Sequence, residues 1–389
     1  AVGGYEDELA DFEAGKRAVR PEEAQKDYRK TIELLRSLIG QFPRYRFLDG
    51  ALYLHGYCLT ETGQEIEGKE AFVQLVTSHG SSRFAPEAWM RIGEHYFDYN
   101  ELEPAAAAYL QVMKFTDSAY YDRALYKLAW TYYRMDDFDQ AIARFMELVE
   151  YADAHKSEEG TSDLRPEAVQ YLAVSLAEED WDGDGEPDPE PPVQRTFRYL
   201  TGKKPHEVEV LRKLGDIFYD NTRYADAAAI YRYLLQQFPR DPGNPEVHGK
   251  IVVCLERLQR RDDAMAEREA LSQAYGKDSA WYQQNQNDRK AVRAAEQLTE
   301  EALIAAAVYN HDKAQSLKDR AKVMGDAAAL AESKRYYEVA ARNYEEYLRR
   351  YPLSKNSYDL NFYYADCLYF SFHFKEAAAQ YAKVRDAEP

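Results

Sequence analysis

The chain has 389 residues, of which 45% are hydrophobic, and a formal net charge of −18 at pH 7. This length can bury the cores of about two or three ordinary domains or of one long repeat array. The strong negative charge disfavours nucleic acid and anionic lipid headgroups, so a basic or neutral protein or peptide is the expected partner.

The first predicted element is a helix near Glu22 to Gln41. Phe42-Pro43 ends it, because the residue before a proline avoids the helical conformation. After it, one frame of apolar residues recurs along the chain. Each unit of the frame predicts two helices, and a small residue at the centre of the first lets the second approach closely. The central small residues are Gly56, Gly93, Ala129, Ala173, Gly215 and Val252, and most steps between them are 36 to 37 residues.

Two of these units carry the frame most completely, and Pro239 closes the second of them. A recurrence at this period predicts a stacked array of helix pairs, which offers binding surface rather than a catalytic pocket. The two units read Trp89-x-x-Ile92-Gly93-x-x-Tyr96 with Ala105-x-x-x-Tyr109-x-x-Val112, and Leu211-x-x-Leu214-Gly215-x-x-Phe218 with Ala227-x-x-x-Tyr231-x-x-Leu234.

The frame changes after Gly276. The segment from Ser279 to about Lys322 is polar and nearly free of helix breakers, which predicts one or two unusually long helices. The frame returns in Ala340-x-x-x-Tyr344-x-x-Tyr347, and a last pair ends at Pro389. We therefore predict an array of about six helix pairs over residues 1–276, with an acidic insertion near residues 178–192, and a long-helix segment with two further units over residues 277–389.

These units resemble tetratricopeptide repeats from about Glu22 to Pro389. The resemblance implies an all-α fold, a right-handed superhelical solenoid of antiparallel helix pairs with a concave peptide-binding groove. Units slightly longer than the usual ~34 residues, many tyrosines and the ending Tyr351-Pro352-Leu353-Ser354 are similar to the bacterial cell-envelope branch of the family. That branch includes outer-membrane assembly lipoproteins and cell-division coordinators. No polar capping helix follows the last pair, so we expect that the native protein continues or that this face contacts a partner.

In this family the exposed side of each first helix lines the groove. Carried over by phase, the resemblance places aromatic, Met and Arg side chains there, and these residue types anchor protein interfaces. The alternative is that the same rings only pack between neighbouring repeats. The groove residues of the first three pairs are Tyr53, Tyr57, Met90, Glu94, Phe97, Tyr126, Trp130, Tyr133 and Arg134, and Asp216, Tyr219, Phe362, Asp366 and Tyr369 follow later in the chain.

An acidic loop between the two helices of the fourth pair is the sharpest local motif. Its carboxylates alternate along the chain, and Gly185 then permits a sharp turn. Calcium takes about six to eight oxygen ligands, and this spacing gathers carboxylates around one point. The segment resembles the first nine positions of an EF-hand loop, in which the metal ligands would be Asp180, Asp182, Asp184, Glu186 through its carbonyl, and Asp188.

The match to an EF-hand loop is incomplete, because Pro191 stands where such a loop has its bidentate glutamate. We therefore expect weak, structural Ca²⁺ binding, with a dissociation constant of about 10⁻⁴–10⁻³ M. Such a site fills only where calcium is about millimolar, which favours the periplasm or cell envelope over the alternative, the cytoplasm. The alternative for the motif itself is a solvated acidic loop stiffened by its prolines.

No arrangement of nucleophile, base and phosphate loop stands out, so no enzymatic activity is expected. The three cysteines, Cys58, Cys254 and Cys367, are too scattered for a disulfide framework or a zinc site, so we expect them to be buried and free. No apolar run approaches the ~20 residues that span a bilayer.

We predict a non-enzymatic scaffold that binds a peptide segment or a partner protein in its groove, in a bacterial cell-envelope assembly. The alternative is an architectural subunit of an envelope secretion or motility machine, with a structural calcium site. Such a subunit would contact its partners through its end faces and long helices. The sequence does not specify the partner or the oligomeric state.

Overall fold

The computed structural model describes residue 16 and residues 27–155, 164–352 and 357–386. Every regular element in those ranges is an α-helix, so the predicted all-α fold is confirmed. Contacts divide the chain into two compact units, Ala1–Ala168 and Val169–Pro389. The predicted boundary near residue 276 lies inside the second unit and stays a prediction.

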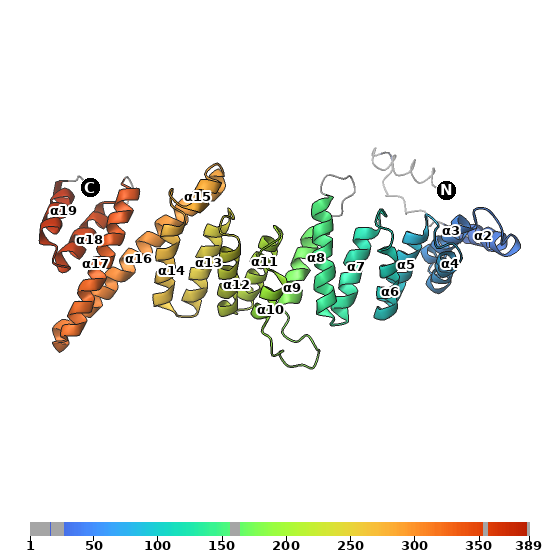
Figure 1. The fold of residues 1–389 in the computed structure, drawn as a ribbon, viewed down its shortest axis with the longest axis horizontal. Coiled ribbons are helices and arrows are strands. Elements are labelled where there is room, and N and C mark those ends of the chain that lie inside the picture. Colours follow the sequence, from blue (N-terminus) through green and yellow to red (C-terminus); the bar gives the residue numbers. More distant parts are fainter. Residues whose placement is uncertain (1–15, 17–26, 156–163, 353–356, 387–389) are drawn as a thin grey trace. The chain divides into compact units, whose positions relative to one another are not determined.

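In the first unit each helix from α2 to α8 packs against the next one along the chain (Figure 1). The predicted first helix ends at Gln41 as expected but begins at Arg29, and the predicted residues 22–26 lie outside the described residues. The helices are α2 (Arg29–Gln41), α3 (Leu48–Glu61), α4 (Glu65–Ser78), α5 (Ala85–Asp98), α6 (Leu102–Val112), α7 (Tyr121–Arg134) and α8 (Phe138–Ala154). Helix α9 (Arg165–Ala177) carries the chain across the boundary into the second unit.

The second unit continues the same arrangement of helix pairs, and the short helices α10 and α15 pack against α12 and α16. The predicted chain end at Pro389 and the predicted turn residues Leu353 and Ser354 lie outside the described residues. The helices are α10 (Pro192–Tyr199), α11 (Glu207–Asp220), α12 (Tyr224–Gln237), α13 (Asn244–Arg257), α14 (Arg261–Ala274), α15 (Ala280–Asn285), α16 (Arg289–Met324), α17 (Ala327–Arg350), α18 (Ser357–Phe370) and α19 (Phe374–Asp386).

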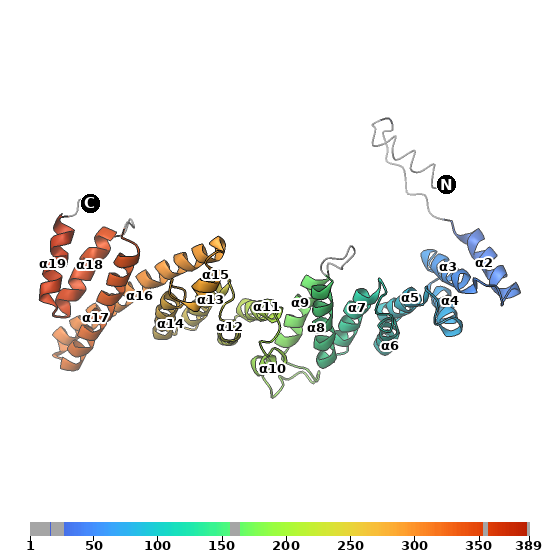
Figure 2. The same ribbon diagram turned by 45° about the horizontal axis from the view of Figure 1, so that its top comes forward.

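The predicted long helix is α16, which runs for 36 residues and lies beside the 24-residue α17 (Figure 2). The Asp288 carboxylate accepts the backbone N–H groups of Lys290 and Ala291, each at 3.0 Å, and so caps the start of α16. Gly325 ends the helix with a φ of 68°, a left-handed conformation that glycine adopts without strain. The prediction of one or two long helices is confirmed, with the short α15 placed before α16.

In three pairs the central small residue is a glycine that lies against an aromatic ring from the second helix. A Cβ atom added at Gly56 would lie 2.8 Å from Phe72 Cε1, and one at Gly93 would lie 2.5 Å from Tyr109 Cε1. Gly215 is crowded in the same way by the ring of Tyr231. The predicted close approach of the two helices therefore has a specific cause, a ring that occupies the space of a side chain.

A left-handed residue joins the two helices in six of the pairs, always seven residues after the small residue, which in the last pair is Ala365. The amide that follows it closes the end of the first helix; Glu101 N, for example, donates to Tyr96 O at 2.8 Å. Only one of the six is glycine, so residue type alone does not predict this turn. The residues are Gly63, Asn100, Asp136, Thr222, Gln259 and Phe372, with φ between 56° and 78°.

The three cysteines are buried and free, as predicted. Burial raises the pKa of the Cys254 thiol to about 11, so little reactive thiolate forms near neutral pH. Within the described ranges, no helix combines the length and the apolar character required for a membrane span.

The stability of the second unit should depend on pH through the buried His311. The ring is 5% exposed and contacts Gln315 and Tyr344, with Gln315 Nε2 at 3.0 Å from His311 Nε2. Burial lowers the pKa of His311 below its ordinary value of 6.5, so the unfolded chain takes up this proton more readily than the folded chain. The free energy of unfolding should therefore fall as the pH drops from about 7 to about 5.5.

Urea unfolding of the wild type and of His311→Gln at both pH values measures this effect. The variant should lose less stability over the same pH interval, whatever its stability at neutral pH. The exposed His373, replaced in the same way, is the control. An unchanged pH dependence in His311→Gln would contradict the assignment.

Candidate functional site

The predicted groove residues of the first unit lie on α3, α5 and α7, the first helices of its three pairs. Met90 is 3% exposed and packs with Tyr109 and Leu128 in the core. It therefore offers no surface to a partner in this structure, in contrast to the other eight. Arg134 is exposed, and Tyr53, Tyr57, Glu94, Phe97, Tyr126, Trp130 and Tyr133 are partly exposed.

A cluster of aromatic and basic side chains joins α5 to α7; it consists of Phe97, Lys127, Trp130, Tyr133 and Arg134 and is called the α5–α7 cluster below. Lys127 and Arg134 place their cationic groups 4.9 and 4.4 Å from the centre of the Phe97 ring. The Trp130 and Tyr133 rings meet edge to face at 5.5 Å. Cation–π and edge-to-face contacts hold aromatic rings in fixed orientations, so this cluster is a pre-ordered surface.

Hydrogen bonds orient the tyrosines at both ends of this face. Tyr126 donates to Glu167 Oε2 at 2.7 Å. The Tyr53 ring stacks on Phe84 with centroids 4.7 Å apart, and its hydroxyl is bonded to Glu87. Burial and this bond raise the pKa of Tyr53. These hydroxyls are satisfied within the protein, so a partner would contact mainly the rings.

A small polar cavity of about 170 Å³ lies among α3, α4 and α5. Its lining includes Lys69, Arg91 and His95 together with the carboxylates of Glu94 and Asp98. Burial raises the pKa of Glu94, and Arg91 lies 4.0 Å from it. The predicted groove residue Glu94 therefore sits in a cavity with charges of both signs.

The later groove positions in the second unit are partly used inside the fold. Asp216 accepts a hydrogen bond from Tyr231 at 2.5 Å, and Asp366 accepts one from Tyr381. Phe362 and Tyr369 remain 43% and 48% exposed. The two aspartates therefore join the helices of their own pair, a role that differs from the predicted one in the groove.

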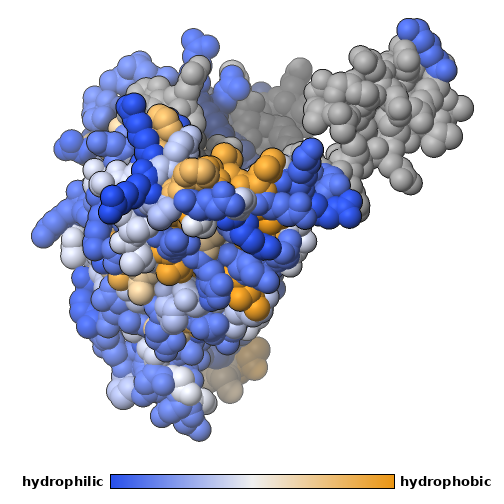
Figure 3. All heavy atoms as spheres, turned by 90° about the vertical axis from the view of Figure 1, so that its right-hand side faces the viewer, coloured by the Kyte–Doolittle hydropathy of each residue, from blue (hydrophilic) through white to orange (hydrophobic). Residues whose placement is uncertain are grey.

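Apolar side chains also gather at the end of the first unit (Figure 3). Leu34 of α2 is 63% exposed, Phe47 is 56% exposed, and Ile66 of α4 is 58% exposed. The described part of the chain gives no contact that covers this apolar surface.

The acidic loop brings together three of its five predicted metal ligands. One carboxylate oxygen from each of Asp180, Asp182 and Asp188 lies within 4.8 Å of the others. Oxygens on opposite sides of a calcium ion with Ca–O distances of about 2.3–2.6 Å are separated by about this length. Asp184 instead accepts the backbone N–H of Glu186 at 2.8 Å, and no carboxylate oxygen of Asp184 belongs to the group. Glu186 as a ligand through its carbonyl stays a prediction. Three carboxylates supply oxygen donors of the kind that calcium takes, which is fewer than the roughly six to eight ligands of a full site.

Backbone N–H groups and one arginine hold the loop in this shape. Asp180 accepts the N–H groups of Gly183 and Gly185 at 2.8 Å each. Arg195 of α10 is 1% exposed, donates to Asp188 Oδ2 at 2.6 Å, and lies 3.8 Å above the Trp181 ring. Arg195 partly neutralises the cluster, so a cation at this site would share Asp188 with it.

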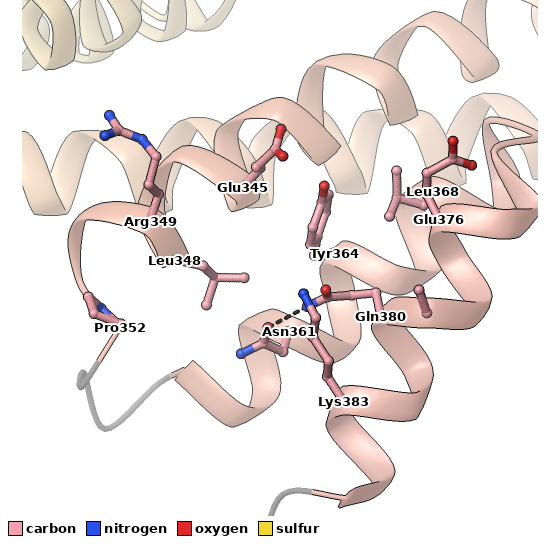
Figure 4. A pocket seen from close by; sticks show the side chains of 11 residues that line it. Glu345, Leu348, Arg349, Pro352, Asn361, Tyr364, Leu368, Glu376, Gln380 and Lys383 are labelled. Atoms are coloured by element: carbon pink, nitrogen blue, oxygen red, sulfur yellow. Dashed lines mark hydrogen bonds between the residues drawn. The ribbon is translucent and has the colours of Figure 1, made fainter.

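A larger cavity of about 510 Å³ lies among α17, α18 and α19 (Figure 4). Gln380, which is 5% exposed, donates to Asn361 at its floor, and the Tyr364 hydroxyl is bonded to Glu345. Its four charged side chains, Glu345, Glu376, Arg349 and Lys383, balance one another. The cavity therefore has no net charge that would favour an anionic or a cationic ligand.

Two segments of the chain match family models described as tetratricopeptide repeat, residues 123–153 and residues 218–285. Both units therefore contain tetratricopeptide repeats. Among solved structures, a tetratricopeptide repeat protein from Parabacteroides merdae is similar at 14% identity, over 86% of this chain and 98% of that chain, with a TM-score of 0.31. The C-terminal part of a repeat-containing protein from Cytophaga hutchinsonii is similar at 14% identity, over 79% and 98% of the two chains, with a TM-score of 0.28. No curated protein matches the sequence.

Proposed function

We propose that this chain, which carries tetratricopeptide repeats, is a non-enzymatic scaffold that holds a segment of a partner protein on the first-helix face of its first unit. The observation that carries the proposal is the α5–α7 cluster. Its rings are partly exposed and its guanidinium is exposed, and both are fixed in orientation and of the types that dominate protein interfaces. The cavity beside Glu94 adds charged side chains to this face, and these charges can orient a bound segment.

Replacing Trp130 with alanine should weaken partner binding by about 2 kcal/mol, or roughly thirtyfold in the dissociation constant, if the ring is a central anchor. To identify the partner, a photoreactive phenylalanine derivative is placed at Tyr133 and crosslinked in an extract of the native source. The same group at Leu110, 40% exposed on the second helix α6, is the matched control.

Binding of the isolated partner is then measured for the wild type and for Trp130→Ala, with circular dichroism to verify that the variant is folded. Equal crosslinking from Tyr133 and Leu110, or unchanged affinity in Trp130→Ala, would remove the first-helix face as the binding surface.

An architectural role is a second candidate, and the tip of the α16–α17 hairpin favours it. Val323 and Met324 are 84% and 74% exposed at this tip. Apolar side chains exposed together mark a site of contact with another protein. We propose that in this case the tip contacts a neighbouring subunit of an envelope assembly. A crosslinking group at Val323 that captures a partner, while Tyr133 captures none, would favour this role over the groove.

We further propose that the acidic loop binds Ca²⁺ weakly and structurally, which would suit a periplasmic or other envelope compartment with about millimolar calcium. Asp182→Asn should weaken calcium binding by about tenfold, because its oxygen belongs to the three-carboxylate group. Asp184→Asn, which removes the same charge outside that group, should have a smaller effect.

Isothermal titration and the calcium-dependent shift in melting temperature measure both variants. Equal losses of calcium affinity in the two variants would support the five-ligand arrangement predicted from the sequence. A wild type that neither binds nor is stabilised by about 5 mM calcium would exclude the site and its argument for the envelope.

A further inference from the structure

A basic groove lies in the second unit where the loop after α10 meets the loop after α12. Its volume is about 550 Å³, which is typical of ligand sites of ~300–1,000 Å³. Pro205, Val208, Phe238 and Pro239 form its apolar lining. Its charged lining consists of the cations Lys203, Lys204, Arg212 and Arg240 and the carboxylates Glu209 and Asp241.

The loop that carries the two lysines is fixed by the surrounding structure. Gly202 has a φ of 77°, and a side chain there would collide with Gln237. The carboxylate of Glu207, which is 1% exposed, accepts the N–H groups of Gly202 at 2.5 Å and of Lys204 at 3.3 Å. The groove is therefore pre-formed and needs little ordering to accept a ligand.

The charges of the groove are not balanced within it. Arg212 and Asp241 form an ion pair at 2.8 Å. Lys203 and Arg240 are exposed, and neither forms an ion pair with any residue that the structure describes. The groove therefore has an excess of two positive charges in a chain whose net charge is −18. The cavity among α17, α18 and α19 shows the contrast, because its charges cancel.

We propose that the basic groove docks an acidic linear segment of a partner protein that carries an apolar side chain between its carboxylates. The two unpaired cations bind the carboxylates, and the wall formed by Val208, Phe238 and Pro239 buries the apolar side chain. A nucleic acid is the less suitable polyanion, because its extended charge would be repelled by the rest of this acidic surface. This surface is separate from the proposed groove of the first unit.

The test uses a fluorescein-labelled peptide of about ten residues that alternates glutamate with leucine and phenylalanine. Fluorescence anisotropy measures its binding to the full chain. The double variant Lys203→Glu/Arg240→Glu should weaken binding by at least about tenfold. The matched control is Arg83→Glu/Lys114→Glu, which makes the same charge change in the equivalent inter-loop groove of the first unit.

Two companion peptides complete the test: one with every glutamate replaced by glutamine, and one with the apolar residues replaced by serine. Both should bind more weakly than the parent. Circular dichroism verifies that the variants are folded. Any of these results would overturn the proposal: no binding of the parent at about 1 mM, equal binding of the glutamine or the serine peptide, equal weakening in the control variant, or preferential binding of a single-stranded oligonucleotide.

Discussion

Replacing Arg195 with methionine should lower the free energy of unfolding of the second unit by about 3–5 kcal/mol. The guanidinium donates to Asp188 Oδ2 at 2.6 Å and to the carbonyl oxygens of Glu178 and Glu190 at 2.7 and 3.2 Å. Methionine replaces the aliphatic part of the arginine side chain but has no donor. It would leave a partly buried carboxylate without its counter-charge and two carbonyl groups without this bond. Removing one partner of a buried ion pair is costly for that reason.

Arg198→Met is the matched control, because Arg198 lies on the same short helix and pairs with Glu190 at 3.0 Å. Both of these side chains are largely exposed, at 58% and 42%, so this variant should lose less than about 1 kcal/mol. Urea unfolding followed by circular dichroism measures both variants. If the loop binds calcium, millimolar calcium should recover part of the stability lost in Arg195→Met, because the ion supplies the missing positive charge. Equal losses in the two variants would contradict a central role for Arg195.

The helix pairs could be predicted from the sequence because the signal is local. Apolar residues at helical spacing around a small residue identify a buried stripe, whatever the rest of the chain does. The start of α2 could not be predicted in the same way. Asp27 accepts the backbone N–H of Arg29 at 3.1 Å, which favours a helix start there, although the preceding polar residues look equally helical.

The candidate sites depend more on contacts between distant residues, which a single sequence does not reveal. Met90 has the phase of a groove residue, yet Tyr109 of α6 and Leu128 of α7 pack against it and bury it. Arg195 carries no local signal, and its role depends on a loop that folds back onto α10. One sequence signal does accompany such a contact: an acidic residue stands fifteen positions before a tyrosine in Asp216/Tyr231 and again in Asp366/Tyr381.

The Gly215→Ala variant should lower the free energy of unfolding of the second unit by about 1–3 kcal/mol, although alanine normally stabilises a helix. The added methyl group would overlap the Tyr231 ring, which is fully buried. The ring has no room to move aside, because its hydroxyl donates to Asp216 at 2.5 Å. Relief therefore requires α11 and α12 to separate, which weakens their packing.

Gly249→Ala tests the cause. Gly249 lies inside α13, and a methyl group there would meet only Leu298 Cδ2 at an ordinary 3.5 Å. This variant should gain about 0.5–1 kcal/mol from helix propensity alone. The double variant Gly215→Ala/Tyr231→Phe should lose less than the sum of its single variants, since phenylalanine frees the ring from Asp216. Chemical denaturation of the wild type, Gly215→Ala, Tyr231→Phe and the double variant measures the coupling. Strictly additive losses of stability would mean that the methyl group and the ring do not compete for the same space.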